Sequence, residues 1–495
     1  MREGTRMFLM TAVAALTVVS DVGHSAPGPG RDSFGFESYN GRSIAAERGF
    51  VRVPLRHAAP DGPAIEIAYV RLPATTAHPK APIVFLDGGP GASGIRTGAA
   101  RGFFETFDAL RSVADVILLD QRGIGLSRPR LACPAVDEPP LDLFAIDRPT
   151  QVARARAASE SCLARLRAEG IDPAAFNAME SADDLEDLRQ ALGVDRLSLL
   201  GFSYGTHLGL AALRRHGDHI ERSVLIGIEG PNHTIKLPSS LDSSLARLSA
   251  LAAKDPIGRE VPDMSALLRR LLDRLDREPA RVSLTDPRSG RTGTLAVNAD
   301  GLRRILLQDL GDASDVPVFP AMLLGIERGD TELLAWFVRK RYLQARAGFP
   351  PLAVTVDAAS GATAQRWERI EREAKTSLLA PRELVLRPVS EVWHPAELGD
   401  SFRAAITSDV PTLFMSGTLD ANTPPIQAEE IARGFRHAVT LVVENAGHED
   451  MLGQRDVGET LVRYFQGVDV SGQKLQRPRI RFLSIEEAKA DRSRR

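Results

Sequence analysis

A serine at the apex of a tight turn is the first residue in this chain whose surroundings suggest chemistry. Residues 201–205 read G-x-S-x-G, after an apolar run at 197–200 and before a helix-like segment at 204–215. The pattern predicts a strand, a sharp turn and a helix, because only glycine avoids collisions at such close approaches. Ser203 would then present its hydroxyl above a sheet, facing the N–H groups that begin the helix.

A serine hydroxyl is a poor nucleophile near neutral pH, so it needs an imidazole base and an acid that orients the base. Asp420 follows a predicted strand at 413–415, and His448 lies in the loop after the next predicted strand. Both loops would lie at the carboxyl edge of the sheet, where open α/β sheets bind their ligands. Because the chain order serine, acid, histidine also fits such a fold, we predict a catalytic triad of Ser203, Asp420 and His448.

Other candidates for the acid and the base have weaker placements. The alternative acids share the histidine's own loop and cannot easily approach the far side of its ring. The alternative histidines fall on the helix after the serine, where a packing or surface role is favoured. These alternatives are Glu444, Glu449 and Asp450 for the acid, and His207 and His216 for the base.

An oxyanion formed at Ser203 would need two backbone N–H donors. One is expected from Tyr204, the residue after the nucleophile, and the other from the glycine loop at 88–91. Glycine lets the main chain approach a substrate closely, so we predict Gly89 as the second donor, with Gly88 as the adjacent alternative.

Length and charge exclude some classes of function. The chain has 495 residues, 43% of them hydrophobic, which favours one large core with an insertion, or two domains. Its 62 basic and 64 acidic side chains give a net charge of −2, which argues against nucleic-acid or membrane-surface binding by bulk charge. The glycines at 88–94 lack the lysine and spacing of a phosphate cradle, and no metal cluster is visible, so we predict no cofactor and no metal.

The amino-terminal residues resemble an export signal. Two arginines precede an apolar run at 7–19 and then small residues, so we interpret residues 1–26 as a signal peptide whose cleavage position stays open. The run is too short to span a bilayer comfortably, so we expect a secreted or periplasmic protein without stable membrane insertion. In an exported protein, Cys133 and Cys162 are expected to form a disulfide, the alternative being two buried thiols.

Apolar patterning before residue 229 predicts a sheet covered by helices. A hairpin is expected around a Pro-Asp-Gly turn, followed by strands that alternate with helices, which indicates a mostly parallel sheet. The predicted strands are 50–55, 65–71, 81–86, 116–119, 197–200 and 223–228, and the helices are 181–193, with a serine cap and a closing glycine, and 204–215.

After residue 229 apolar residues recur at helical spacing, and no strand alternation competes over most of this span. Helices are predicted at 266–279, 301–310, 332–346 and 363–375, with a possible small hairpin at 281–297. The α/β pattern returns with strands at 410–415 and 438–443 and helices at 425–435 and 457–465. The tail after Gly472 is basic and poor in apolar residues, so we expect it to be surface-bound or partly disordered.

This patterning divides the chain. The predicted parts are a core at 35–229 and 401–472, a largely helical cap insertion at 230–400, and a tail at 473–495.

Five motifs in order resemble one family. They are GGPG at 88–91, DQRGIGLS at 120–127, GFSYGT at 201–206, GTLDANTP at 417–424 and NAGHE at 445–449. Together they are similar to the α/β-hydrolase fold peptidases of the proline iminopeptidase and tripeptidyl aminopeptidase group, over residues 50–465, and GFSYGT is closer to the tripeptidyl branch. The resemblance implies release of short amino-terminal units from peptides, under a helical cap that limits access. Asp87 departs from the histidine or asparagine that relatives tend to show, which puts substrate preference in doubt more than catalysis.

The expected substrate is a small peptide or ester. In a peptidase of this group a carboxylate should bind the cationic amino end, and Glu229 is our hypothesis for it, although it could instead satisfy a loop or helix terminus. The first interpretation is a secreted serine aminopeptidase that forms an acyl-enzyme. A carboxylesterase with the same triad and a binding protein without turnover are the alternatives, and the oligomeric state stays open.

Overall fold

A computed structural model describes residues 32–494, except 136–138, 287, 289, 349, 380–382 and 394–396, with only the backbone described at 383–386. The signal peptide predicted at residues 1–26 lies outside the described residues.

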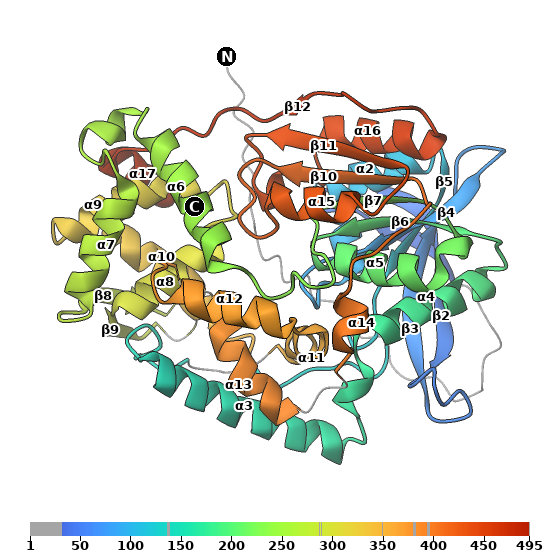
Figure 1. The fold of residues 1–495 in the computed structure, drawn as a ribbon, viewed down its shortest axis with the longest axis horizontal. Coiled ribbons are helices and arrows are strands. Elements are labelled where there is room, and N and C mark those ends of the chain that lie inside the picture. Colours follow the sequence, from blue (N-terminus) through green and yellow to red (C-terminus); the bar gives the residue numbers. More distant parts are fainter. Residues whose placement is uncertain are drawn as a thin grey trace.

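A ten-stranded sheet in the described part of the chain organises the fold, in the order β1-β2-β3-β5-β4-β6-β7-β10-β11-β12 (Figure 1). The first three strands and the β3–β5 pair are antiparallel, and all remaining neighbours are parallel. The mostly parallel sheet predicted from the sequence is therefore confirmed. The strands are β1 Asp32–Glu37, β2 Ser43–Pro54, β3 Ala64–Leu72, β4 Lys80–Leu86, β5 Ala114–Leu119, β6 Leu197–Phe202, β7 Ile220–Ile226, β10 Thr412–Gly417, β11 Ala438–Glu444 and β12 Leu475–Gln476.

Helices cover both faces of the sheet. Phe104 and Phe107 on one side and Leu208 on the other are fully buried, so each face carries its own apolar core. One face is covered by α1 Gly94–Gly98, α2 Phe103–Leu110 and α16 Arg455–Gln466, and the other by α4 Ala178–Leu192, α5 Tyr204–His216 and α15 Pro425–Ala432. Helix α4 begins three residues before the predicted serine cap, because the Asn177 side chain accepts hydrogen bonds from the Met179 and Glu180 N–H groups.

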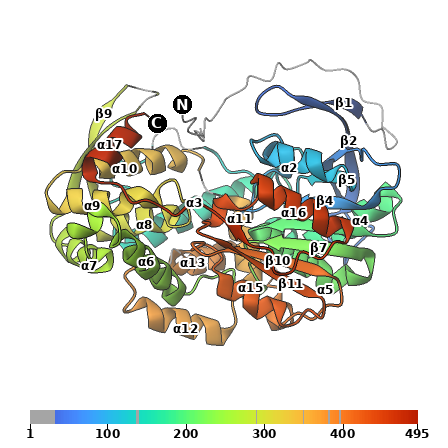
Figure 2. The same cartoon turned by 90° about the horizontal axis from the view of Figure 1, so that it is seen from above.

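The chain between β7 and β10 is largely helical, and much of it forms a body beside the sheet, seen on the left of Figure 2. Residues from several of its helices bury a separate apolar cluster that includes Leu268, Phe319 and Phe337. The predicted hairpin is present as β8 Ala280–Thr285 paired with β9 Thr292–Val297. The helices are α6 Pro238–Ala252, α7 Met264–Leu275, α8 Ala299–Asp309, α9 Phe319–Glu327, α10 Glu332–Ala345, α11 Pro351–Ser360, α12 Ala364–Ala374 and α13 Glu383–Trp393, followed by α14 Gly399–Arg403.

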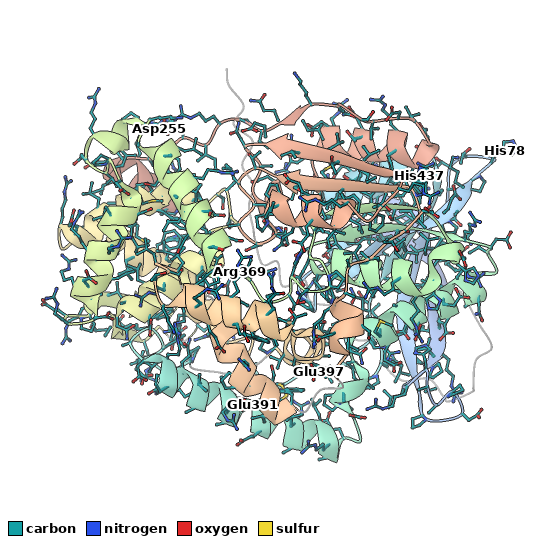
Figure 3. The ribbon with its side chains drawn as sticks, in the orientation of Figure 1. His78, Asp255, Arg369, Glu391, Glu397 and His437 are labelled. Atoms are coloured by element: carbon teal, nitrogen blue, oxygen red, sulfur yellow. A yellow bond between two sulfur atoms is a disulfide. The ribbon has the colours of Figure 1, made fainter. Side chains whose placement is uncertain are left out.

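A long helix that precedes α4 in the chain also contacts this body. Helix α3, Arg148–Ala168, packs along α13, and Arg156 donates to the Pro388 carbonyl at 2.8 Å and to Glu391, labelled in Figure 3, at 3.1 Å. Just before α3, the Phe144 carbonyl accepts a hydrogen bond from the Asn298 N–H at 3.0 Å. Residues within the 35–229 range thus pack against the insertion.

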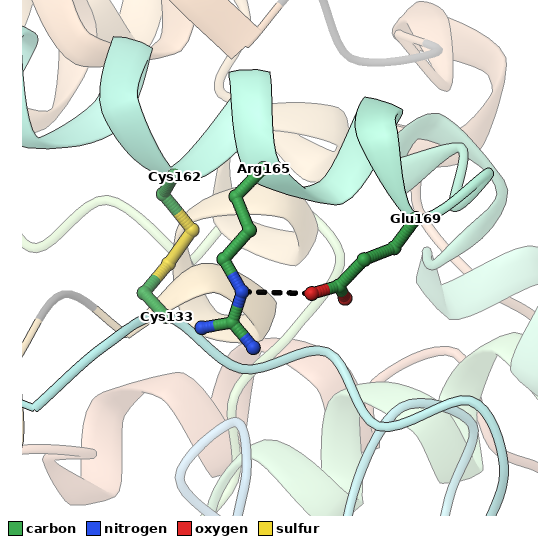
Figure 4. Close-up of a disulfide and its surroundings, with 4 residues drawn as sticks. All are labelled: Cys133, Cys162, Arg165 and Glu169. Atoms are coloured by element: carbon green, nitrogen blue, oxygen red, sulfur yellow. Dashed lines mark hydrogen bonds and ion pairs between the residues drawn. A yellow bond between two sulfur atoms is a disulfide. The ribbon is translucent and has the colours of Figure 1, made fainter.

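Cys133 and Cys162, the pair predicted from the sequence, form a disulfide between the loop after β5 and α3 (Figure 4). Their Cα atoms lie 5.5 Å apart, and 29 residues separate them in sequence. Closing a loop of this length stabilises a fold by about 3.6 kcal/mol in the chain-entropy model.

The tail is ordered over most of its length. Strand β12 pairs with β11, and the chain then crosses to the insertion, where α17 Ile485–Arg492 packs beside α9 and α10 (Figure 1). Asp255 of the insertion accepts a hydrogen bond from the Phe482 N–H at 2.8 Å, and the Phe482 ring is buried. Of the two expectations for the tail, a surface-bound segment is therefore confirmed and partial disorder is wrong, because a few apolar side chains suffice to dock the tail on the insertion.

Within the described residues, none of the helices combines the length and apolar character needed to cross a membrane.

Candidate active site

The turn between β6 and α5 holds Ser203 in a strained conformation. Its φ of 54° and ψ of −124° lie in a region that residues other than glycine rarely adopt. Two close approaches force this turn, since a Cβ on Gly205 would lie 1.8 Å from the Leu86 carbonyl oxygen, and one on Gly201 would lie 2.7 Å from the Gly205 oxygen. The glycines predicted from the motif are therefore required by packing, and Ser203 is the residue that the turn lifts out.

Two hydrogen bonds hold the backbone of Ser203. The Ser203 N–H donates to the Ile226 carbonyl on β7 at 2.9 Å, and the Thr206 hydroxyl donates to the Ser203 carbonyl at 2.7 Å. The same Thr206 oxygen accepts from the Glu229 N–H at 2.8 Å, which links the turn to the segment that enters the insertion.

Asp420 and His448 form a buried pair. Asp420 Oδ2 lies 2.8 Å from His448 Nδ1, and the two residues are only 2% and 3% exposed. With an Nδ1–H directed at the carboxylate, the Nε2 atom is the unprotonated nitrogen of the neutral ring.

Thr423 completes this pair, although the sequence analysis assigned it no role. Its hydroxyl donates to Asp420 Oδ2 at 2.6 Å and lies 3.2 Å from His448 Nδ1. The Asp420 carboxylate also accepts from the Thr423 N–H at 2.8 Å. The sequence did contain a signal for this contact: an Asp followed three residues later by Thr can form a turn in which the Asp carboxylate accepts backbone hydrogen bonds.

The environment moves the two pKa values in opposite directions. Burial disfavours the charged ring, but the charge and hydrogen bond of Asp420 outweigh it and raise the pKa of His448. Burial likewise opposes ionisation of Asp420, but the charge and hydrogen bond of His448, with hydrogen bonds from Thr423, lower its pKa. The arrangement therefore stabilises an imidazolium next to a carboxylate.

The imidazole lies over the strand ends that flank the serine. Its ring centroid is 5.1 Å from that of Phe202, the residue before Ser203. A Cβ on Gly227, just after β7, would lie 3.0 Å from His448 Cε1. The structure thus brings the acid, the histidine and the residues next to Ser203 together at the carboxyl edge of the sheet.

The glycine loop after β4 approaches Ser203 from the other side. A Cβ on Gly88 would lie 2.9 Å from Ser203 Cβ, so the main chain passes directly over the serine. The Gly88 N–H donates to the Asp87 carboxylate at 2.7 Å, and Asp87 also accepts from the Thr97 hydroxyl at 2.5 Å. Because the Gly88 N–H is thus occupied, the geometry favours Gly89, whose φ is 111°, over Gly88 as an oxyanion donor.

Glu229 lies at the start of the insertion and already has a partner. The residue is 7% exposed, and its Oε2 atom lies 2.7 Å from Lys236 Nζ. Burial opposes ionisation, but the charges of Lys236 and His207 lower the pKa of Glu229. The carboxylate is therefore ionised and bound to an ammonium group of the same chain.

The alternative triad residues have other contacts. Asp450 accepts from the Gly447 N–H at 2.8 Å, and Glu444 is exposed at the end of β11. His207 lies 3.0 Å from the Ser360 hydroxyl, and His216 lies 2.7 Å from Asp183. Three of these alternatives are engaged in other contacts, and Glu444 and Glu449 are exposed, so the geometry favours Asp420 and His448 over them.

A cavity of about 360 Å³ opens between α6 and the loop after β10. Asp420 borders it, together with serines of α6, Arg247 and Glu429. Its volume falls within the range of about 300–1,000 Å³ found for small-ligand sites. Ser203 does not line the cavity, so the cavity adjoins Asp420 of the Asp420–His448 pair and not the serine.

Two groups in the described part of the chain have the spacing of metal ligands, His57 with Asp184 and Asp187, and Asp309 with Asp312 and Asp315. Each group contains a cation of the chain, since Arg122 binds Asp184 at 2.6 Å and Lys340 binds Asp309 at 2.8 Å. These ion pairs account for the clustered carboxylates without a metal.

The chain belongs to the α/β-hydrolase fold family, which it matches over residues 81–453. It is 31% identical over 197 residues to the serine protease Hip1 of Mycobacterium tuberculosis, covering 37% of this chain and 36% of that protein. It is also 31% identical over 211 residues to the tripeptidyl aminopeptidase of Streptomyces coelicolor, covering 40% of this chain and 38% of that protein. The chain thus spans well under half the length of both relatives. Among solved structures, an esterase from Thermogutta terrifontis aligns with 15% identity and a TM-score of 0.35, over 84% of this chain and 98% of that one.

Proposed function

We propose that this chain is an exported serine peptidase that removes short amino-terminal units from peptides through an acyl-enzyme. The observation that carries the proposal is the buried Asp420–His448 pair, 2.8 Å between Oδ2 and Nδ1, next to a serine on a strained turn. The similarity to relatives named as a serine protease and a tripeptidyl aminopeptidase supports the substrate class. The disulfide between Cys133 and Cys162 fits an oxidising compartment.

In the proposed mechanism, Ser203 Oγ attacks the scissile carbonyl while His448 Nε2 takes its proton. Asp420 holds the ring in the required tautomer and stabilises the imidazolium. The N–H groups of Gly89 and Tyr204 stabilise the negative charge on the carbonyl oxygen. His448 then protonates the leaving amine, and a water molecule activated by the same ring releases the acyl unit and restores Ser203.

Labelling with a fluorophosphonate tests the nucleophile directly. We expect covalent modification of Ser203 in the unaltered protein and none in the Ser203→Ala variant. Modification at another serine, or none at all, would contradict the mechanism and favour a binding protein that keeps the fold.

Comparing two substrate types separates peptidase from esterase. We expect a higher kcat/KM for a tripeptidyl anilide with a free amino end than for a short acyl nitrophenyl ester. The reverse order would favour the carboxylesterase interpretation, because both reactions use the same triad.

Glu229 is proposed to bind the substrate ammonium in exchange for Lys236. The Glu229→Gln variant should raise KM for free-amine peptides and leave acetylated peptides unaffected. The Lys236→Met variant should have the opposite effect, since it removes the ammonium that competes for the carboxylate. Equal changes for free and acetylated peptides in both variants would reject this role.

A further inference from the structure

A loop of the insertion contacts the histidine loop at the candidate active site. The His448 N–H donates to the Gly311 carbonyl at 3.1 Å, just after α8. The contact is close, because a Cβ on Gly447 would lie 2.9 Å from the same Gly311 oxygen. The insertion therefore fixes the backbone of His448, while Asp420 fixes its ring.

The same loop also touches the loop that carries the acid. A Cβ on Gly311 would lie 2.9 Å from Asn422 Nδ2, two residues after Asp420. Gly311 thus contacts the backbone of the histidine loop directly and the acid loop through the Asn422 side chain.

Helix α17 holds this loop in place through Arg492. One guanidinium nitrogen lies 2.9 Å from Asp315 Oδ1, and another donates to the Ser314 carbonyl at 2.8 Å. The guanidinium also stacks over the Trp336 ring at 4.2 Å from its centroid, and its side chain is 3% exposed. The ion pair with Asp315 and the directional, charge-assisted hydrogen bond to Ser314 both come from a buried, stacked arginine, so together they fix the loop in position as well as stabilising it.

We propose that Arg492 is a positioning residue for His448, acting through the loop 311–315. The proposal rests on the proposed function, since it assumes that His448 is the general base. Under this proposal the tail contributes to turnover. Helix α17 lies 37 to 44 positions after His448 and packs on the insertion, so it acts on the histidine only through the loop.

The test compares the kcat and KM of the Arg492→Gln and Lys489→Gln variants. Both are made in the full-length protein, and kcat is expressed per serine that a fluorophosphonate titrates. Lys489 also secures α17, by ion pairs with Asp330 at 2.6 Å and Glu332 at 2.7 Å, but it does not contact the loop 311–315. We expect Arg492→Gln to lower kcat about tenfold with KM little changed, because small misplacements of a catalytic group are costly. Lys489→Gln should keep kcat within about twofold, and Arg492→Lys should restore part of the loss.

A second variant covers the case in which Arg492→Gln does not fold. Asp315→Asn keeps the stacked arginine but weakens the hold of both Arg492 and Lys340 on the loop. It should therefore also lower kcat, and the two changes combined should be less than additive. Both variants should move the acidic limb of the kcat/KM profile to lower pH, because a displaced His448 is held less well by Asp420.

Two outcomes would overturn the inference: unchanged kcat per titrated site in Arg492→Gln and Asp315→Asn, or an equal loss in Lys489→Gln. Failure of the proposed function is distinguishable, since the unaltered protein would then either show no labelling of Ser203 or be labelled and prefer the nitrophenyl ester to the peptidyl anilide.

Discussion

Among the histidines that contact carboxylates, His57 and His448 are held in different ways. His57 uses both ring nitrogens, with Nδ1 at 2.6 Å from Glu180 and Nε2 at 3.1 Å from Asp187. His448 directs Nδ1 at Asp420, and within the described residues its Nε2 has no hydrogen-bond partner. A ring with both nitrogens bound cannot take a proton from a substrate or a serine, whereas a ring bound at one nitrogen can.

The surrounding charges differ as well. His57 belongs to the Arg122 cluster, which we define as Arg122, His57, Glu180, Asp184 and Asp187, whereas His448 has one carboxylate bound to its ring. Burial disfavours a charged His57, but hydrogen bonds with Asp187 and Glu180 outweigh it and raise the pKa of His57 to about 9. His57 is therefore cationic at neutral pH and acts as a structural tie, while His448 can cycle between its two forms.

Replacing each histidine is the strongest way to break this comparison. We expect His448→Ala to lower kcat on the order of 10⁵–10⁶-fold, because a triad without its base leaves the serine unactivated. His57→Gln should leave kcat within about twofold, since the Arg122 cluster contacts no reacting group. Steady-state kinetics on the same peptidyl anilide checks both, and a comparable loss in the two variants would contradict the assignment.

Asp420→Asn should have the second largest effect. The amide N–H of asparagine can donate to His448 Nδ1, which favours the tautomer that carries its proton on Nε2. This tautomer cannot act as the base, so kcat should fall about 10⁴-fold while the fold persists. Circular dichroism serves as the control for folding. Retention of more than a tenth of the activity would point to a different acid.

The pH dependence of turnover follows from the raised pKa of His448. The base must be neutral to act, so kcat/KM should rise with pH through a midpoint above the ordinary value of 6.5 for histidine. Measuring the profile between pH 5 and 9 on an uncharged substrate checks this. A midpoint at or below 6.5 would show that Asp420 does not stabilise the imidazolium.

Local features of the sequence were sufficient for the nucleophile turn and the sheet. The G-x-S-x-G motif constrains its own backbone, since Gly201 and Gly205 admit no Cβ, and the strands are short apolar runs bounded by glycine loops. The order of the motifs then placed Asp420 and His448 at one edge, because parallel strands end on the same side.

Tertiary contacts account for what the sequence did not predict. Helix α3 has 21 residues but buries only Ser159, Cys162, Leu163 and Leu166, so its pattern lacks an apolar face of helical period. The Gly311–His448 hydrogen bond joins two backbone groups, which carry no signature in side-chain type. The tail lacked long apolar runs, but Ile480, Phe482 and Ala488 lie in the core of the insertion.

The smallest expected effect concerns stability at the Arg122 cluster. His57→Gln should lower the free energy of unfolding by about 2 kcal/mol at pH 6, because hydrogen bonds to a buried carboxylate cluster are weakened. The pKa of His57 rises on folding from 6.5 to about 9, so its contribution is complete below pH 6.5 and is lost as pH rises through 9.

The difference between the unaltered protein and His57→Gln should therefore shrink between pH 6 and pH 9.5, as measured by urea unfolding. His78→Gln is the matched control, since His78 is exposed on the loop before β4 (Figure 3) and should change stability at neither pH. A constant difference across this range would mean that His57 is held by packing alone. In that case the protonation states of His57 and His448 would no longer distinguish them. The two histidines would then differ only in how many ring nitrogens are bound and in their access to the serine.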